Sequence, residues 1–401
     1  MKCSRTVLMI TVLIGLGLTK GFSQETYLSP NLYNEGTQIE RIQRAVDEAV
    51  HTTGKVVIPR YDAVEKTSVW RIDKAILLPA DIELELHNCT IKLSDRCRDN
   101  FIRSANVGLG ISCIKPLKNI KVVGKGNVLL EGADNPRSTG DHNKVLSKNP
   151  EDGFSHSYGS DAGKPEENQK GGWRNHAIIM AYVDGFEISG ITLKDYHAHA
   201  IVLERAKNGL IRDITFDVRQ AVEVDGRDRL VLNQDGLGVR FGCKNIIIDQ
   251  CKGKSGDDFI NIGLTDTGMP AGEENVNVVS GSIYAGEVDN IENIYLQNWQ
   301  DFYSISHRAI RIMPIGKLRI KNVFIENMII HPASKQGLVV EHTSNMKHLI
   351  VRNMVTYSPV RAKGISDASF CDIFYLGEGE GIDVEANETV CVERVKLVQK
   401  K

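Results

Sequence analysis

The sequence has little proline, few aromatic residues and almost no net charge. Its 401 residues include 11 Pro and 6% aromatic side chains, and the formal charge is −2 at pH 7. Without an excess of positive charge, the chain has no general electrostatic attraction for nucleic acid or anionic membranes, and we expect neither as a partner. Glycine is plentiful at 36 residues, and together with abundant Ile, Val and Asn it favours a β-rich fold with many tight turns.

Long apolar runs are missing except near the N-terminus. Lys2 and Arg5 precede the apolar run Thr6–Leu18, and the small residues Gly21 and Ser23 follow it. This order is typical of a secretory signal, and the run is too short to cross a bilayer as a helix. We therefore expect residues 1–23 to be removed and the mature protein to be exported, periplasmic or extracellular, with no membrane span.

Cysteines at metal-binding spacing are also absent. The chain has 8 Cys, and no two of them stand in a Cys-x-x-Cys arrangement. This argues against a structural zinc site, and we expect no metal and no cofactor. We predict a disulfide between Cys371 and Cys391, whereas Cys243 and Cys251 are expected to be buried thiols.

The body of the chain repeats short apolar segments. Strand-like runs occupy 55–58, 75–77, 82–86, 90–93, 120–123, 128–130 and 178–181. Beyond them, five six-residue segments can be superposed: 199–204, 235–240, 257–262, 308–313 and 336–341. The third position is always large and apolar, in the order Ile201, Leu237, Phe259, Ile310 and Leu338. Each segment is accompanied by a second kind of strand with an Asn-rich turn, for example 245–248 and 291–296.

These repeats predict an all-β, right-handed parallel β-helix. Asp235 and Asp257 are 22 residues apart, which is the length of one coil in a stacked solenoid. We expect residues 24–401 to form one domain and the protein to be a monomer. The polar stretch Gly132–Gly172 lacks periodicity and is predicted to be a long loop beside the binding face. The segment after Asp367 is predicted to be a cap or a loosely attached tail.

One amphipathic helix precedes the strands. Apolar residues recur at helical spacing between Thr37 and Val50. Asn34 or Thr37 is a suitable N-cap, and Gly54 is a suitable stop. Such a helix can cover the open end of a solenoid, where the first coil would expose its core.

The superposition predicts which side chains share one face. Alternation along a strand places positions one, two and four outside and positions three and five inside. Asp235 and Asp257 then lie on neighbouring coils, with His199 one coil before and Arg308 one coil after. Asp258 falls at position two, where its neighbours are small and leave a groove: Ala200, Gly236, Ala309 and Gly337. Arg311 falls at position four, and Asn261 at the inward position five.

Crowded carboxylates of this kind suit inverting glycoside hydrolysis. The reaction needs a protonated carboxyl group to protonate the leaving oxygen and an ionised carboxylate to activate water. Packing carboxylates together raises the pKa of at least one of them, so that one proton is retained near neutral pH. The stretch from Asn233 to Ile262 therefore predicts an active site.

Here the sequence resembles a known family. Asn233-Gln234-Asp235-Gly236 is similar to the Asn-Thr-Asp-Gly motif of the polygalacturonase family, glycoside hydrolase family 28. Gly256-Asp257-Asp258 matches its Gly-Asp-Asp motif, and Arg311-Ile312-Met313 resembles its Arg-Ile-Lys motif. The resemblance implies a secreted polysaccharide hydrolase acting on a pectic or related substrate. It implies Asp257 as general acid, with Asp235 and Asp258 sharing the role of base.

Two departures bear on the substrate. The Gly-His-Gly motif of the family has no counterpart in 275–281, and Met313 stands where the family has the Lys that would help Arg311 hold a uronate carboxylate. His307 and Arg308 are candidates to replace the missing His, and Arg240 is a further candidate cation.

For the other candidates, a purely structural role remains an alternative. His199 either contacts substrate or satisfies a turn, and Trp173 either stacks on a sugar ring or anchors the base of the long loop. Two other functions also remain: a polysaccharide lyase with Ca²⁺-binding acids and a Lys or Arg base, and a non-catalytic glycan-binding β-helix.

Overall fold

The structure is a computed structural model. It describes residues 26–97, 99–108, 111, 114–134, 176–219, 221–224, 227–230, 234–263, 290–302, 308–314, 318–331, 334–385 and 390–397. The predicted signal at 1–23, most of the predicted loop 132–172, Trp173 and His307 lie outside the described residues.

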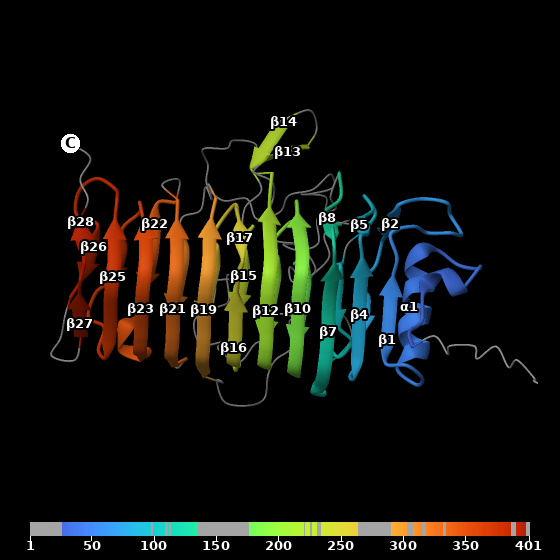
Figure 1. Ribbon diagram of the computed structural model, residues 1–401, viewed down its shortest axis with the longest axis horizontal. Coiled ribbons are helices and arrows are strands. Elements are labelled where there is room, and N and C mark those ends of the chain that lie inside the picture. The colour runs from blue at the N-terminus through green and yellow to red at the C-terminus, as the bar shows by residue number, and fades with distance from the viewer. Residues whose placement is uncertain are drawn as a thin grey trace, which may run out of the picture.

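Parallel strands stack into two long sheets that run the length of the molecule (Figure 1). The larger sheet has a central path of β1 (Lys55–Ile58), β4 (Ile82–His87), β7 (Leu117–Lys125), β10 (Val183–Lys194), β12 (Lys207–Asp217), β16 (Lys244–Asp249), β19 (Ile291–Asp301), β21 (Ile320–Ile330), β23 (Met346–Thr356), β25 (Ala368–Tyr375) and β27 (Val390–Glu393). Off this path lie β2 (Val69–Ile72), β5 (Thr90–Leu93), β8 (Leu129–Glu131), β17 (Lys252–Gly253) and β28 (Lys396–Leu397).

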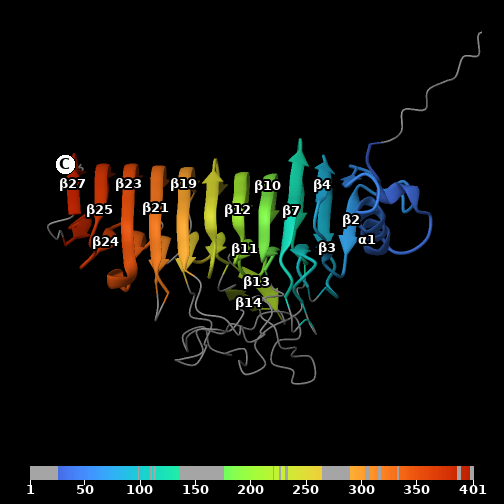
Figure 2. The ribbon, with the colours of Figure 1, turned by 90° about the horizontal axis from the view of Figure 1, so that it is seen from below.

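The second sheet has ten strands and lies as a separate layer beside the first, as Figure 2 shows for β3, β11 and β24. Its order is β3 (Ile76–Leu78), β6 (Ile102–Ser104), β9 (Ile178–Ala181), β11 (Ile201–Glu204), β15 (Leu237–Val239), β18 (Ile260–Gly263), β20 (Arg308–Met313), β22 (Gln336–Val340), β24 (Val360–Ala362) and β26 (Ile382–Val384). The chain alternates between the two sheets, which makes the fold a right-handed parallel β-helix, as predicted. A small antiparallel pair, β13 (Ala221–Val224) and β14 (Arg227–Leu230), stands apart from both sheets.

The core lies between the sheets and consists of stacked files of apolar side chains. In the ten-stranded sheet, Ile201 pairs with Leu237, Leu237 with Ile260, and Ile260 with Ile310, all fully buried. Each such side chain contributes roughly 1.5–3 kcal/mol to folding by leaving water. The file continues through the whole sheet, so neighbouring coils support one another.

An asparagine ladder follows one bend of the larger sheet. Asn208, Asn245, Asn293 and Asn322 all have positive φ, a conformation that Asn tolerates better than most residues. The side-chain amide of Asn245 donates to Asn208 (2.8 Å), that of Asn293 to Asn245 (2.8 Å), and that of Asn322 to Asn293 (2.6 Å). The Asn-rich turns read from the sequence are thus hydrogen-bonded from coil to coil.

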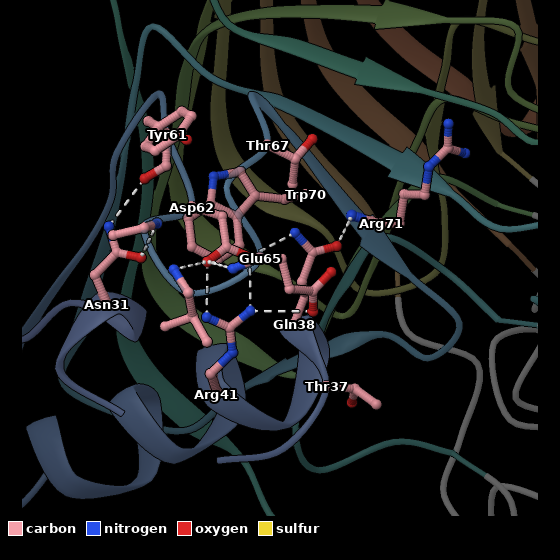
Figure 3. A network of polar contacts seen from close by, with 12 residues as sticks. Asn31, Thr37, Gln38, Arg41, Tyr61, Asp62, Glu65, Thr67, Trp70 and Arg71 are labelled. Atoms are coloured by element: carbon pink, nitrogen blue, oxygen red, sulfur yellow. Dashed lines mark hydrogen bonds and ion pairs between the residues drawn. The ribbon is translucent and has the colours of Figure 1, made fainter. Parts of the chain in front are cut away.

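The predicted helix is present as α1 (Gln38–Ala49) and packs on the first coil (Figure 1). Thr37 is its N-cap and forms a capping box with Glu40. On the buried side of α1, Arg41 donates two hydrogen bonds to Asp62, at 2.8 and 2.6 Å, and Gln38 donates a third at 2.7 Å (Figure 3). This fully buried network ties the helix to the loop that follows β1.

The C-terminal part corrects two predictions. It is not a cap or a loose tail, because β25, β26 and β27 continue the two sheets in register. The predicted disulfide is wrong: Cys371 and Cys391 are free. Cys371 pairs with Glu393, and Cys391 pairs with Ser369, so the two cysteines are two residues out of register. Adjacent strands offset in this way hold the Cα atoms too far apart for a disulfide.

Candidate active site

In the ten-stranded sheet, the third of the five superposed segments is shifted by one residue from its predicted alignment. Leu237 pairs with Ile260, and Ile260 pairs with Ile310. Asp258, and not Asp257, therefore occupies the first position beside Asp235, and their coils are joined by a hydrogen bond from the Gly236 amide to the Asp258 carbonyl (3.1 Å). The prediction that Asp257 and Asp235 are direct neighbours in the column is wrong by one residue.

The same shift moves Phe259 to position two. Its ring is buried and packs edge-on against Phe216 and Trp299, with ring centroids 5.4 and 4.9 Å away. A Cβ atom on Gly236 would lie 2.5 Å from this ring, so Gly236 has to be small to admit Phe259. Gly236 thus serves core packing at a corner of the coil, and Asp258 lies at position one and not, as predicted, at position two.

Local hydrogen bonds fix the two turns that carry the carboxylates. Gln234 donates its side-chain amide to the Tyr196 carbonyl (2.6 Å) and accepts the Gly256 amide at its own carbonyl (3.0 Å). Asp257 accepts the Asp258 amide on Oδ1 (2.9 Å), which orients its side chain. Sequence reasoning placed Asp235, Asp257 and Asp258 in one site, and they do lie together on adjoining coils.

Asp258 is nearly buried and is surrounded by polar partners. Arg308 donates to its Oδ1 at 3.4 Å, Arg311 Nη1 lies 3.6 Å from its Oδ2, and Asn261 donates to Oδ2 at 3.3 Å. Arg308 and Arg311 are partly exposed, so both reach the face. Asn261 was expected inside the coil, but it pairs with Arg311 at position four and supports Asp258.

Asp235 lies against a buried pair of histidines. His199 Nδ1 is 3.4 Å from its Oδ2, and the rings of His199 and His176 meet edge to face at 4.8 Å. Arg240 Nη2 is 3.1 Å from His199 Nε2. Because Arg can only donate, Nε2 is the acceptor and the hydrogen of the neutral ring is on Nδ1, facing Asp235. His199 and Arg240 are 5% and 1% exposed, as buried as Asp235 itself at 4%, and His199 lies between Arg240 and Asp235.

The carboxyl groups do not share one electrostatic environment. Burial raises the pKa of Asp235 well above its usual range, and the Asp257 and Asp258 carboxylates raise it further. Burial, reinforced by Asp257, raises the pKa of Asp258 to about 6, while Arg308 and Arg311 oppose the shift. Burial also lowers the pKa of His199 well below its usual range, and Arg240 adds to this effect. The cluster can therefore retain a proton near neutral pH.

One further residue of the site was missed in the sequence. Glu341 follows β22 and binds Arg311 from its Oε2 to Nη2 (2.8 Å) and Nε (3.1 Å). Its Oε1 lies 3.6 Å from Arg308 Nη2. Glu341 is at position six of the fifth segment, one coil after Met313 at the same position. The superposition of the five segments is the one sequence signal that could have placed it in the site. Among the described residues, no group of three or more His, Cys, Asp or Glu is arranged to hold a metal ion.

Comparison with known families agrees with this geometry. The sequence model of glycosyl hydrolases family 28 matches residues 151–369. The chain belongs to this family. A comparison with curated protein sequences finds no significant match. None of the described helices is long and apolar enough to cross a membrane.

Solved structures give a fold-level likeness. An exopolygalacturonase from Thermotoga maritima is 14% identical, with a TM-score of 0.57 over 92% of this chain and 86% of that one. A family 28 exopolygalacturonase from Yersinia enterocolitica is 11% identical, with a TM-score of 0.48 over 94% of this chain and 79% of that one. The adhesin PfbA of Streptococcus pneumoniae is 14% identical, with a TM-score of 0.43 over 94% and 93%. At this identity, the likeness to the Thermotoga protein shows the fold of a family 28 member.

Proposed function

We propose that this family 28 glycosidase cleaves a polysaccharide, pectic or related, by inverting hydrolysis. Asp257 is the general acid, and Asp258 and Asp235 share the role of base. The observation that carries the proposal is the carboxyl cluster: its buried members favour retention of a proton near neutral pH, and Asp257 is its most exposed member. Membership of the family supports the reaction class.

The roles follow from access and from charge. A general acid has to touch the glycosidic oxygen, and Asp257 is half-buried whereas Asp235 and Asp258 are 4% and 3% exposed. Asp258 has two guanidinium partners that favour its ionised form. It is therefore the better of the two bases above its pKa of about 6.

The reaction is balanced in one displacement. Asp257 gives its proton to the glycosidic oxygen as the bond from that oxygen to the anomeric carbon breaks. A water molecule attacks the anomeric carbon from the opposite face and gives a proton to Asp258 or Asp235. The product has the opposite anomeric configuration, and a proton returns to Asp257 through solvent.

The test is a panel of plant and algal polysaccharides incubated with the purified protein. New reducing ends without ultraviolet-absorbing unsaturated ends support hydrolysis, and proton NMR of the first product reads its anomeric configuration. Unsaturated ends would assign a lyase, and binding without cleavage would assign a glycan-binding protein. Retention of configuration would overturn the inverting mechanism alone.

We also infer export from the sequence pattern at 1–23, and we expect the protein to be a monomer. N-terminal sequencing of the mature protein and its elution in size-exclusion chromatography test these two statements. A mature chain that still begins at Met1, or one that elutes as a dimer, would contradict them.

A further inference from the structure

Glu341 stands where it controls the cations of the site. Val340 pairs with Ile312 on the preceding coil, so Glu341 lies beside Met313, and its amide donates to the Ile312 carbonyl at 2.9 Å. Met313 is buried, at 2% exposed. Where the family resemblance expects a second cation at the Met313 position, this chain presents a carboxylate one coil further on.

This carboxylate uses the donors that a substrate carboxylate would need. Arg311 directs both Nε and Nη2 at Glu341 Oε2, at 3.1 and 2.8 Å, and Arg308 Nη2 lies 3.6 Å from Oε1. Recognition of a sugar carboxylate depends on such a fork of guanidinium donors. The Glu341 side chain is 29% exposed, so it lies at the face and not in the core.

Among the described residues around the triad, each guanidinium group already has a partner. The described carboxyl groups there are Asp235, Asp257, Asp258 and Glu341. The described guanidinium groups are those of Arg308 and Arg311, each within 3.6 Å of both Asp258 and Glu341, and Arg240, which is buried against His199. A uronate arriving over Arg311 would bring a carboxylate next to Glu341, and like charges at that distance repel.

We propose that Glu341 is a specificity-determining residue that makes the subsite over Arg308 and Arg311 take an uncharged sugar unit and reject a uronate. The pair of Glu341 and Arg311 offers acceptors and donors together, which suits the hydroxyl groups of a neutral sugar, each both donor and acceptor. This inference rests on the proposed function, because it names the substrate class of the same site.

Binding and cleavage can be separated in the Asp257→Asn background, which we expect to bind substrate without cleaving it, because Asp257 is the proposed acid. The two probes are a galacturonate oligomer and the same oligomer with its carboxyl groups reduced to primary alcohols, so that they differ only at the carbon that carries the charged group. Dissociation constants are measured by calorimetry for Asp257→Asn alone and with Glu341→Gln added. The matched control adds Glu292→Gln, which removes a carboxylate paired with Lys244 and Lys321 on the other sheet.

We expect Asp257→Asn to bind the reduced oligomer at least tenfold more tightly than the galacturonate oligomer. Adding Glu341→Gln frees Arg311 and should move this ratio at least tenfold towards the galacturonate, whereas Glu292→Gln should leave it unchanged. A preference for galacturonate with Glu341 intact, an unchanged ratio in Glu341→Gln, or binding of neither oligomer overturns the inference. A failure of the proposed function gives a different result. In that case wild-type protein would show this binding preference but would release no reducing ends.

Discussion

Two buried clusters of Asp and Arg in this molecule behave in opposite ways. Under α1, burial works against ionisation of Asp62, yet the hydrogen bonds from Arg41 and Gln38 lower its pKa to about 2. At the candidate active site, burial raises the pKa of Asp258 to about 6 despite Arg308 and Arg311. Burial next to arginine therefore does not decide the charge state of a carboxyl group.

The difference lies in the number of donors and the number of like charges. Asp62 receives donors at 2.6–3.2 Å from Arg41, Gln38 and the amides of Val64 and Glu65. Asp258 has guanidinium partners only at 3.4–3.6 Å, and the carboxyl groups of Asp235 and Asp257 lie near it. Complete pairing produces a structural carboxylate, and incomplete pairing among like charges produces one that can exchange protons.

The largest effect is expected from removing the acid of the incompletely paired cluster. Asp257→Asn should lower kcat on the cleaved polysaccharide by at least about 100-fold, because general acid catalysis contributes about 10²–10⁴. Asp217→Asn, which alters a half-exposed aspartate paired with Lys254, is the control and should retain activity. Retention of more than a tenth of the wild-type rate in Asp257→Asn would remove it from the acid role.

Breaking the fully paired cluster should destabilise the protein without touching the chemistry. Asp62→Asn leaves the buried Arg41 with only the half-exposed Glu65 as a counter-ion, and breaking a buried ion pair costs about 3–5 kcal/mol. Because the folded pKa of Asp62 is depressed, its stabilising contribution is present above the unfolded pKa near 4 and is lost as pH falls through about 2. Thermal unfolding at pH 7 tests the prediction, and a melting temperature equal to that of wild type would contradict it.

Relieving the crowded cluster should have the opposite sign. Asp235→Asn removes a buried carboxyl group whose folded pKa is raised. A raised pKa gives stability that is fully present below the unfolded pKa and is lost as pH rises through the folded pKa. The variant should therefore be more stable than wild type at pH 7.5 and no more stable at pH 4. Calorimetry at both pH values measures this, and a loss of stability at pH 7.5 would show that Asp235 is fully paired.

The smallest effect concerns the pH profile. With Asp258 as base, kcat/KM should rise with pH through about 6, as the carboxyl group ionises. Arg308→Gln removes a cation that favours the ionised form of Asp258. The midpoint of the rise in kcat/KM should therefore move to higher pH by about 0.5–1 unit. An unchanged midpoint would mean that a group other than Asp258 controls the rise.

Much of the fold followed from the sequence because its rules are local. The helix with its N-cap at Thr37, the strand runs and the Asn turns each depend on a few adjacent residues, and all are present. Placing Phe259 at position three failed because the alternation rule holds only inside a strand. The strand β18 begins at Ile260, and at the preceding corner Phe259 also points inward.

The environment of the site could be predicted only in part. The three aspartates could be assigned to one face because a coil length separates them along the chain. The burial of His199 and Arg240 could not be predicted, since it depends on packing against His176 and Asp235 from neighbouring coils. The pairing of Glu341 with Arg311 could not be predicted for the same reason. Residues on different coils become neighbours through the register of the strands, and a shift of one residue changes which side chains meet.

The first coil also bears on whether two molecules of this protein can join end to end. A solenoid presents unpaired backbone groups at its ends, and a second molecule could add its own strands there in the manner of a growing fibril. Here Leu28 pairs with Val56 on the outer side of β1, and α1 lies over the apolar file below. This arrangement closes the N-terminal end to such growth, and loss of the helix would open a template for self-assembly.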